Sequence, residues 1–151
     1  MRSNLPSYVR EHSGEWAVVE ENRRSARFRN PNKGRVKVLI VTVDGGMITA
    51  GVRADFVVAH PKLVDVIVEL KGSDVAQAIE QIRATVPAWW QHALAGKVHA
   101  ALVVRGQGVH PKTSLLTERL AKRFQRDFNM KLLIETRNRD YEFAEFLPER
   151  Q

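Results

Sequence analysis

Two apolar segments joined by a short proline-containing connection constrain the fold of this chain most. The segments Ala54–Ala59 and Leu63–Leu70 are rich in Val, Ile and Phe, and His60-Pro61-Lys62 separates them. This composition is typical of β-strands, and a proline between two such segments is typical of a turn. We therefore predict a pair of antiparallel strands at the centre of the chain.

Acidic residues interrupt both predicted strands at positions where a simple core strand would carry apolar ones. Successive residues of a strand point to opposite faces, and one face of the second strand carries Asp65, Ile67, Glu69 and Lys71. Asp55 lies in the first strand. If the two strands pair across the turn, Asp55, Glu69 and Lys71 converge near one point.

Such a group of side chains has a chemical meaning. Two carboxylates can hold a hard cation such as Mg²⁺, which prefers oxygen ligands and keeps several of its waters. A bound metal ion lowers the pKa of a coordinated water and neutralises the charge of a phosphate. A lysine beside the acids can orient that water or stabilise the transition state.

These residues resemble the motif of the PD-(D/E)XK nuclease superfamily. The motif consists of an acid, a spacer and then acid-X-lysine, which stand here as Ala54-Asp55 and Glu69-Leu70-Lys71. Ala54 replaces the proline of the family's name, a position that supplies no ligand. The resemblance follows most of the chain in the order of its elements and is limited to a handful of residues in identity.

The resemblance implies roles for individual residues. Asp55 and Glu69 would bind Mg²⁺ or Mn²⁺, with the Leu70 carbonyl as a further ligand, and Lys71 would position the attacking water. Relatives often supply one more carboxylate from the first helix, here Glu20 or its neighbour Glu21. A glutamine on the helix after the motif reaches the active site in some relatives, and we assign this role to Gln81.

Each of these residues also has a simpler interpretation. Glu69 and Lys71 could form an ion pair at an exposed strand end, since an isolated E-X-K occurs often in such places. Glu20 and Glu21 could be a solvated pair, and Gln81 could be an ordinary residue at the flank of its helix.

The charge of the chain points to an acidic polymer as partner. The formal net charge is +7 and the pI is about 10.1, and nucleic acid is the expected partner of such a surface. Basic residues are concentrated between Asn22 and Val43, where no acid occurs. We predict that this segment holds the nucleic-acid backbone; a solvated charged face is the alternative. The residues assigned to this contact are Arg23, Arg24, Arg27, Arg29, Lys33 and Arg35.

Hydrophobic periodicity predicts alternating helices and strands over the chain. We predict a helix over Glu15–Arg24, and Asp44-Gly45-Gly46 is typical of a hairpin turn. Ser73 is the expected cap of the next helix and Pro87 its end. The predicted strands are Val36–Val43, Thr49–Ala59, Leu63–Lys71, Val98–Val104 and Met130–Thr136; the other predicted helices are Asp74–Thr85 and Leu115–Phe128.

This order predicts one α/β domain over residues 1–151. The sequence resemblance implies a restriction-endonuclease-like sandwich, in which helices flank a central mixed sheet with an αβββαβ core plus a C-terminal helix and strand. The chain has no cysteine, which excludes disulfides and thiolate metal sites. It shows no secretory signal and no membrane-length apolar segment, so we expect a cytoplasmic protein without a membrane partner.

The function predicted from these observations is metal-dependent hydrolysis of phosphodiester bonds, with DNA favoured over RNA although no residue decides between them. A homodimer or a partner subunit could supply specificity, because the chain is short. The alternative is a catalytically silent protein of the same fold, either a nucleic-acid-binding subunit or an inhibitor or immunity protein. The basic surface argues against an inhibitor of a basic nuclease, and retention of both acids and the lysine argues against loss of catalysis.

Overall fold

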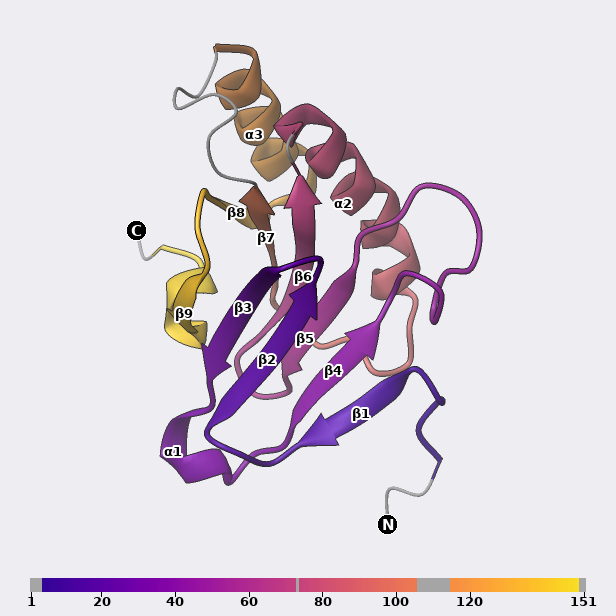
Figure 1. Ribbon diagram of the computed structural model, residues 1–151, viewed down its shortest axis with the longest axis vertical. Coiled ribbons are helices and arrows are strands. Elements are labelled where there is room, and N and C mark those ends of the chain that lie inside the picture. The colour runs from indigo at the N-terminus through magenta and orange to yellow at the C-terminus, as the bar shows by residue number, and fades with distance from the viewer. Residues whose placement is uncertain (1–3, 73, 106–114, 150–151) are drawn as a thin grey trace.

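The structure, a computed structural model, describes residues 4–72, 74–105 and 115–149, with the backbone alone at residues 32, 33, 71 and 72. Its main feature is a six-stranded mixed sheet (Figure 1). The strand order is β1-β4-β5-β6-β7-β8. The strands are β1 (Val9–His12), β4 (Val38–Thr42), β5 (Phe56–His60), β6 (Val64–Gly72), β7 (His99–Arg105) and β8 (Lys131–Glu135).

The sheet changes from antiparallel to parallel at β6. Strands β1, β4, β5 and β6 pair antiparallel, whereas β6, β7 and β8 pair parallel. The parallel connections need crossovers, which α2 (Val75–Trp90) and α3 (Leu115–Phe128) supply. The described chain is therefore α/β with a mixed sheet, as the sequence predicts.

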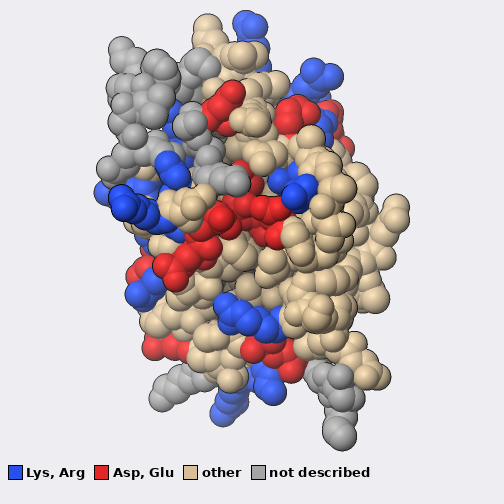
Figure 2. Space-filling model, turned by 45° about the vertical axis from the view of Figure 1, so that its right-hand side comes forward, with Lys and Arg blue, Asp and Glu red and all other residues tan. Residues whose placement is uncertain are grey.

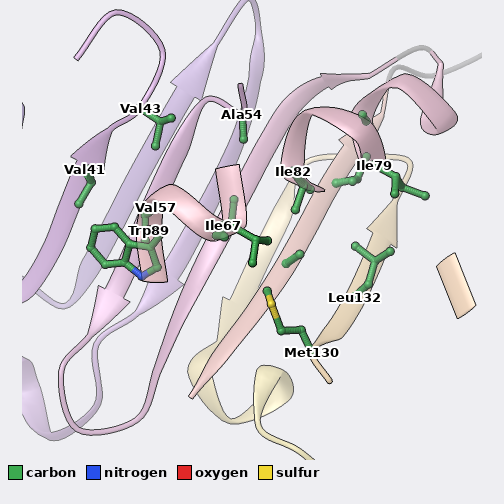
Figure 3. Packing of buried hydrophobic residues seen from close by; sticks show 14 of the residues in the cluster. Val41, Val43, Ala54, Val57, Ile67, Ile79, Ile82, Trp89, Met130 and Leu132 are labelled. Atoms are coloured by element: carbon green, nitrogen blue, oxygen red, sulfur yellow. The ribbon is translucent and has the colours of Figure 1, made fainter. Parts of the chain in front are cut away.

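One face of the sheet packs against α2. Ile79, Ile82 and Trp89 of the helix contact the same buried cluster as Val57 and Ile67 of the strands (Figure 3). The α2 residues that point inward recur at helical spacing because the helix buries one stripe of its surface. Trp89 has no exposed surface and belongs to the core.

A second, smaller sheet covers the opposite face. It has the strand order β2-β3-β9 and consists of β2 (Trp16–Glu21), β3 (Arg24–Arg29) and β9 (Arg139–Glu142). In Figure 1 the β2–β3 hairpin crosses in front of the large sheet. Phe28 stacks on Tyr141 and on Phe143 of the 3₁₀ helix η1 (Phe143–Phe146), which closes this second core.

The prediction of a helix over Glu15–Arg24 is wrong, because this segment forms β2, the hairpin turn and the start of β3. Along β2 only Ala17 and Val19 are fully buried, a period of two that fits a strand whose other face is partly exposed. Asn22 and Arg23 both have positive φ, as a type I′ hairpin turn requires. The residues before this hairpin include β1, which is an edge strand of the large sheet.

The strand expected at Thr49–Ala59 begins later than predicted. Residues 49–54 belong to a loop that follows β4, and the strand β5 starts at Phe56. Gly45 and Gly51 have positive φ in this loop, which breaks the extended conformation before β5.

The boundaries of α2 also differ from the prediction. Asp74 caps the helix, since its carboxylate accepts the Gln77 N–H at 3.1 Å. The predicted cap, Ser73, lies outside the described residues. Pro87 does not end the helix, which continues to Trp90. Proline is tolerated here because its ring faces solvent and only one turn follows it.

The remaining strands and α3 agree with the sequence to within about two residues at each end. α3 has the predicted bounds, and Asn129 ends it with a φ of 52°. The acidic segment after β8 contains β9 and η1. No helix in the described part of the chain is long and apolar enough to cross a membrane.

Candidate active site

The structure places Asp55 and Glu69 on the same side of the large sheet. Phe56 of β5 pairs with Val68 of β6, and the two acids are the next residues beyond that pair. The Asp55 carboxylate reaches across to β6, where it accepts the Leu70 N–H at 2.9 Å. Ile67 packs in the cluster under α2, so the alternation of β6 directs Glu69 to the α2 face as well. The predicted convergence of these two acids therefore agrees with the backbone register.

Both carboxylates are deeply buried. Asp55 is 2% exposed and Glu69 is 0% exposed, and each makes contacts of its own. Two neighbouring carboxylates concentrate negative charge in a region of low dielectric, where a cation is the most effective compensation. Because Glu69 has no exposed surface, a cation can contact both acids only if the side chains that cover Glu69 move.

The other two residues of the acid-X-lysine motif occupy the end of β6. The Leu70 side chain is buried on the opposite face, among the residues that pack on the smaller sheet. Lys71 belongs to β6 by its backbone, whereas its side chain lies outside the described part of the structure. The pairing of β6 with β7 shifts register between Glu69 and Gly72. Such irregularities re-aim side chains at strand ends.

An open cleft of about 760 Å³ lies above Asp55. The N-terminal half of α2 forms one wall, and the loop before β5 forms the other. Figure 2 turns the side with this loop toward the reader and shows a band of acidic side chains flanked by basic ones. The charged residues that line the cleft are Asp44, Arg53, Asp55, Asp74 and Glu80.

Gln81, to which the sequence resemblance assigns a site role, lies on the α2 wall of the cleft. Its side chain lines the cleft together with Asp55, and its amide nitrogen donates to the Arg53 carbonyl at 3.3 Å. Gln77, one helical turn earlier, lines the same wall. The amide of Gln81 therefore anchors the loop before Asp55 as well as facing the cleft.

Sequence reasoning missed Thr85, which fixes the position of the first acid. Its hydroxyl accepts the Ala54 N–H at 2.8 Å and donates to the Gln81 carbonyl at 2.9 Å. Thr85 is fully buried. The signal for it was a hydroxyl between Ile82 and Val86 on the apolar face of α2, where a polar group must find a partner.

Arg53 was also missed, and it closes the loop beside the cleft. Its Nε lies 2.7 Å from the Asp44 carboxylate. Both side chains are partly exposed, so the pair contributes little to stability and serves mainly to order the loop. Asp44, which composition assigned to a turn, thus has a second contact at the rim of the cleft.

Asp65, the other acid on the same face of β6, is part of the packing. Its carboxylate accepts the Trp89 indole N–H at 2.9 Å and the Gly96 N–H at 2.7 Å. His99 lies 3.5 Å away. These donors satisfy the buried carboxylate at the far end of the strand from Glu69.

Glu20 is not positioned by a helix. It is an exposed residue of β2, opposite Ser25 in the smaller sheet, and does not line the cleft. Among the described residues no group of three His, Cys, Asp or Glu side chains could hold a metal ion. Asp55 and Glu69 would thus be the only acidic ligands that these residues offer, with water and the backbone completing the shell, which is a common arrangement for Mg²⁺.

The basic segment is divided between different surroundings. Arg27 contacts Asp140 at 3.1 Å and lies over the Trp16 ring, and Arg29 contacts Glu15 at 3.4 Å and Glu142 at 3.6 Å. Arg35 is exposed, and the side chain of Lys33 lies outside the described part. Arg23 and Arg24 lie at the hairpin turn and take no part in these ion pairs, and Arg23 is exposed.

Comparisons with models of protein families, with curated proteins and with solved structures found no match to this chain.

Proposed function

We propose that this protein is a metal-dependent nuclease that hydrolyses phosphodiester bonds, with DNA favoured over RNA. The observation that carries the proposal is the placement of Asp55, directly before β5, next to Glu69 of the neighbouring strand β6. Both acids lie on one face, beside a cleft lined by Asp55 and Gln81. Two acids that share a site at the end of a strand are suited to bind a divalent cation.

We further propose that the fold is the restriction-endonuclease-like sandwich. The succession β4, β5, β6, α2 and β7 has the βββαβ order of that core, and α3 and β8 extend it. One departure is the N-terminal segment, where the β2–β3 hairpin takes the place of the first helix. A third carboxylate from that helix, predicted as Glu20, is therefore left out of the proposed site.

In the proposed mechanism Asp55 and Glu69 hold the metal ion, with the Leu70 carbonyl as a further ligand. The bound ion would supply a water of lowered pKa and charge neutralisation at the scissile phosphate. Lys71 would orient the attacking water and stabilise charge that develops on the phosphate. Gln81 and Thr85 hold the backbone just before Asp55 and so keep its carboxylate in place.

The test is a cleavage assay on plasmid DNA, single-stranded DNA and RNA, with Mg²⁺, Mn²⁺ or EDTA. The Glu69→Gln protein removes one proposed ligand, and Asp65→Asn is its matched control because it removes a buried carboxylate from the same face of the same strand. We expect metal-dependent cleavage that Glu69→Gln abolishes and Asp65→Asn retains. Cleavage that survives in Glu69→Gln would refute the assignment.

A second experiment separates the lysine from the ligands. Lys71→Ala should lose cleavage while its melting temperature and its affinity for Mn²⁺ stay close to those of the wild type, because the lysine acts on the water and not on the metal. Asp55→Ala should lose both metal binding and cleavage. Wild-type activity in Lys71→Ala would eliminate its catalytic role.

The second candidate is a catalytically silent nucleic-acid-binding protein or subunit of the same fold. The full burial of Glu69 favours it, since a carboxylate without exposed surface is not ready to bind a cation. Nucleic-acid binding without cleavage under every metal condition, together with no measurable uptake of Mn²⁺, would support this candidate over the nuclease.

A further inference from the structure

A pocket of about 340 Å³ at the tip of the β2–β3 hairpin gathers arginine side chains from distant parts of the sequence. The residues that line it include Arg23, Arg24, Arg105, Thr136, Arg137 and Asn138, and none of the described residues in its lining is an acid. We name it the arginine pocket. Hydroxyl and amide groups complete the lining, so the pocket combines positive charge with neutral hydrogen-bonding groups.

Few acids compete for these arginines. Arg23, Arg24 and Arg137 form no ion pair with an acid in the described part of the chain. Glu21 lies opposite Arg24 in the hairpin register, without an ion pair between them. Arg105 is 8% exposed and has contacts of its own. Several guanidinium groups in one pocket repel each other, and an oxyanion would relieve this repulsion.

Hydrogen bonds hold the pocket in shape. The Asn138 side chain accepts the Ser25 N–H at 3.0 Å and donates to the Arg23 carbonyl at 3.3 Å. The segment after β8 is thereby fixed to the hairpin. Arg23 occupies the turn with a φ of 67°, at a position where glycine is the favoured residue. An arginine held in this conformation indicates a use for its side chain.

The location connects the pocket to the candidate active site. Arg105 ends β7 and pairs with Gly72, the last residue of β6. Arg137 follows the end of β8, and β6, β7 and β8 run parallel. The pocket and the Glu69-Leu70-Lys71 motif therefore lie at the same end of the sheet, since the carboxyl ends of parallel strands share one edge.

We propose that the arginine pocket binds a backbone phosphate of nucleic acid and fixes the strand relative to the cleft. The planar guanidinium fork matches the oxygens of a phosphate and binds them in pairs. The choice of nucleic acid as the source of that phosphate rests on the proposed function; the recognition of an oxyanion rests on the pocket alone.

The test measures binding of fluorescein-labelled DNA and RNA oligonucleotides by anisotropy in EDTA, where no cleavage can occur. The double variant Arg23→Gln with Arg137→Gln removes two exposed pocket arginines. The double variant Arg123→Gln with Arg126→Gln is the matched control, because it removes the same charge from exposed arginines that already lie beside the acid Asp127. Thermal melts verify that all proteins fold.

We expect the pocket variant to bind about tenfold more weakly, and the slope of log K against log salt to fall by about 1 for each phosphate that the variant no longer neutralises. The control variant should bind within about threefold of the wild type. Equal losses of affinity in the two variants would overturn the proposal, because net charge alone would then explain binding. Absence of binding to both oligonucleotides by the wild type would overturn it as well.

Inorganic phosphate separates a strand-binding pocket from a site for a free anion. As a competitor it should displace the oligonucleotide from the wild type only at concentrations far above that of the oligonucleotide. Thermal stabilisation by phosphate without any oligonucleotide binding would overturn the assignment to nucleic acid. Pocket-dependent binding in a protein that cleaves nothing would refute the nuclease and support the pocket, so the two failures are distinct.

Discussion

At the scale of single residues, similar side chains serve different purposes according to their surroundings. Asp65 and Glu69 are both buried acids on the same face of β6. Asp65 is satisfied by the Trp89 indole and the Gly96 amide, and so it stabilises the fold. Glu69 lies at the other end of the strand, next to Asp55 and the cleft. The two acids differ in the residues that surround them in space, and the order of residues along the chain does not show these surroundings.

Replacement of Asp65 by alanine should therefore affect stability and not metal binding. The indole N–H of Trp89 and the Gly96 N–H would lose their acceptor inside the protein, which costs about 2 to 4 kcal/mol in the free energy of unfolding. Urea denaturation of Asp65→Ala beside Asp65→Asn measures this cost. Asparagine keeps one acceptor oxygen, so it should lose less. Equal stability of Asp65→Ala and wild type would contradict the assigned role.

Arg23 presents a conflict between stability and binding. Glycine adopts the positive φ of this turn position more easily than arginine does. We expect Arg23→Gly to raise the free energy of unfolding by about 1 kcal/mol and at the same time to weaken oligonucleotide binding. Thermal melts and anisotropy on one protein preparation measure both. A variant that is more stable and binds as well as the wild type would show that the arginine is not used.

At the scale of elements, α2 and the loop before β5 form one unit around Asp55. Thr85 joins them through the Ala54 N–H and the Gln81 carbonyl. This bridge crosses from the buried face of a helix to a strand entrance, and it places the start of β5 against the core. The position of the Asp55 carboxylate thus depends on a hydroxyl group that does not line the cleft.

Thr85→Val should test this bridge with little change in volume. The buried Ala54 N–H would lose its acceptor, and the free energy of unfolding should fall by about 1 to 3 kcal/mol. Cleavage and Mn²⁺ affinity should fall further than in a surface variant of equal stability, because Asp55 is displaced. Thr85→Ser keeps the hydroxyl and should retain both. Identical behaviour of the valine and serine variants would exclude the bridge.

The sequence predicted those parts of the fold and of the candidate site that lie on long, regular elements. Strand β6 and helix α2 have strong periodic patterns, so the faces of Glu69 and Gln81 followed from spacing. The β2–β3 hairpin was missed because its turn is Asn22-Arg23, without the glycine that marks such turns. The cap at Asp74 and the bridge at Thr85 depend on contacts that hydrophobic periodicity does not contain.

At the scale of the whole molecule, the large sheet is covered on both faces, and each layer carries a different candidate site. The α2 layer provides the wall of the cleft. The smaller sheet provides the hairpin that contributes to the arginine pocket. Strands β6 and β7 extend to the edge where both sites lie. A substrate strand that contacted both sites would therefore span two layers that different parts of the chain build.

The stability of this layered molecule should depend on pH through two histidines. His60 of β5 packs its ring against Phe143 of η1, and its Nδ1 accepts the Lys62 N–H. Burial lowers the pKa of His60 below its ordinary value of 6.5. His92 stacks on Trp89 and contacts the Tyr8 hydroxyl, and burial lowers its pKa too.

A lowered histidine pKa means that the unfolded chain binds protons before the folded one does. Stability is then full above the unfolded pKa of about 6.5 and decreases as the pH falls below it, by at most about 1.4 kcal/mol for each unit of pKa difference. Urea denaturation at about pH 7.5 and about pH 5 should show this decrease. The double variant His60→Gln with His92→Gln should flatten the profile over this interval, although its stability at the higher pH is lower. Carboxylates act at more acidic pH. Burial alone would raise the pKa of Glu145, but the hydrogen bond from Arg139 outweighs burial and lowers this pKa. Glu145 therefore loses its contribution to stability only when the pH falls further. A profile with the same slope in the double variant would place the acid sensitivity of the fold in other groups.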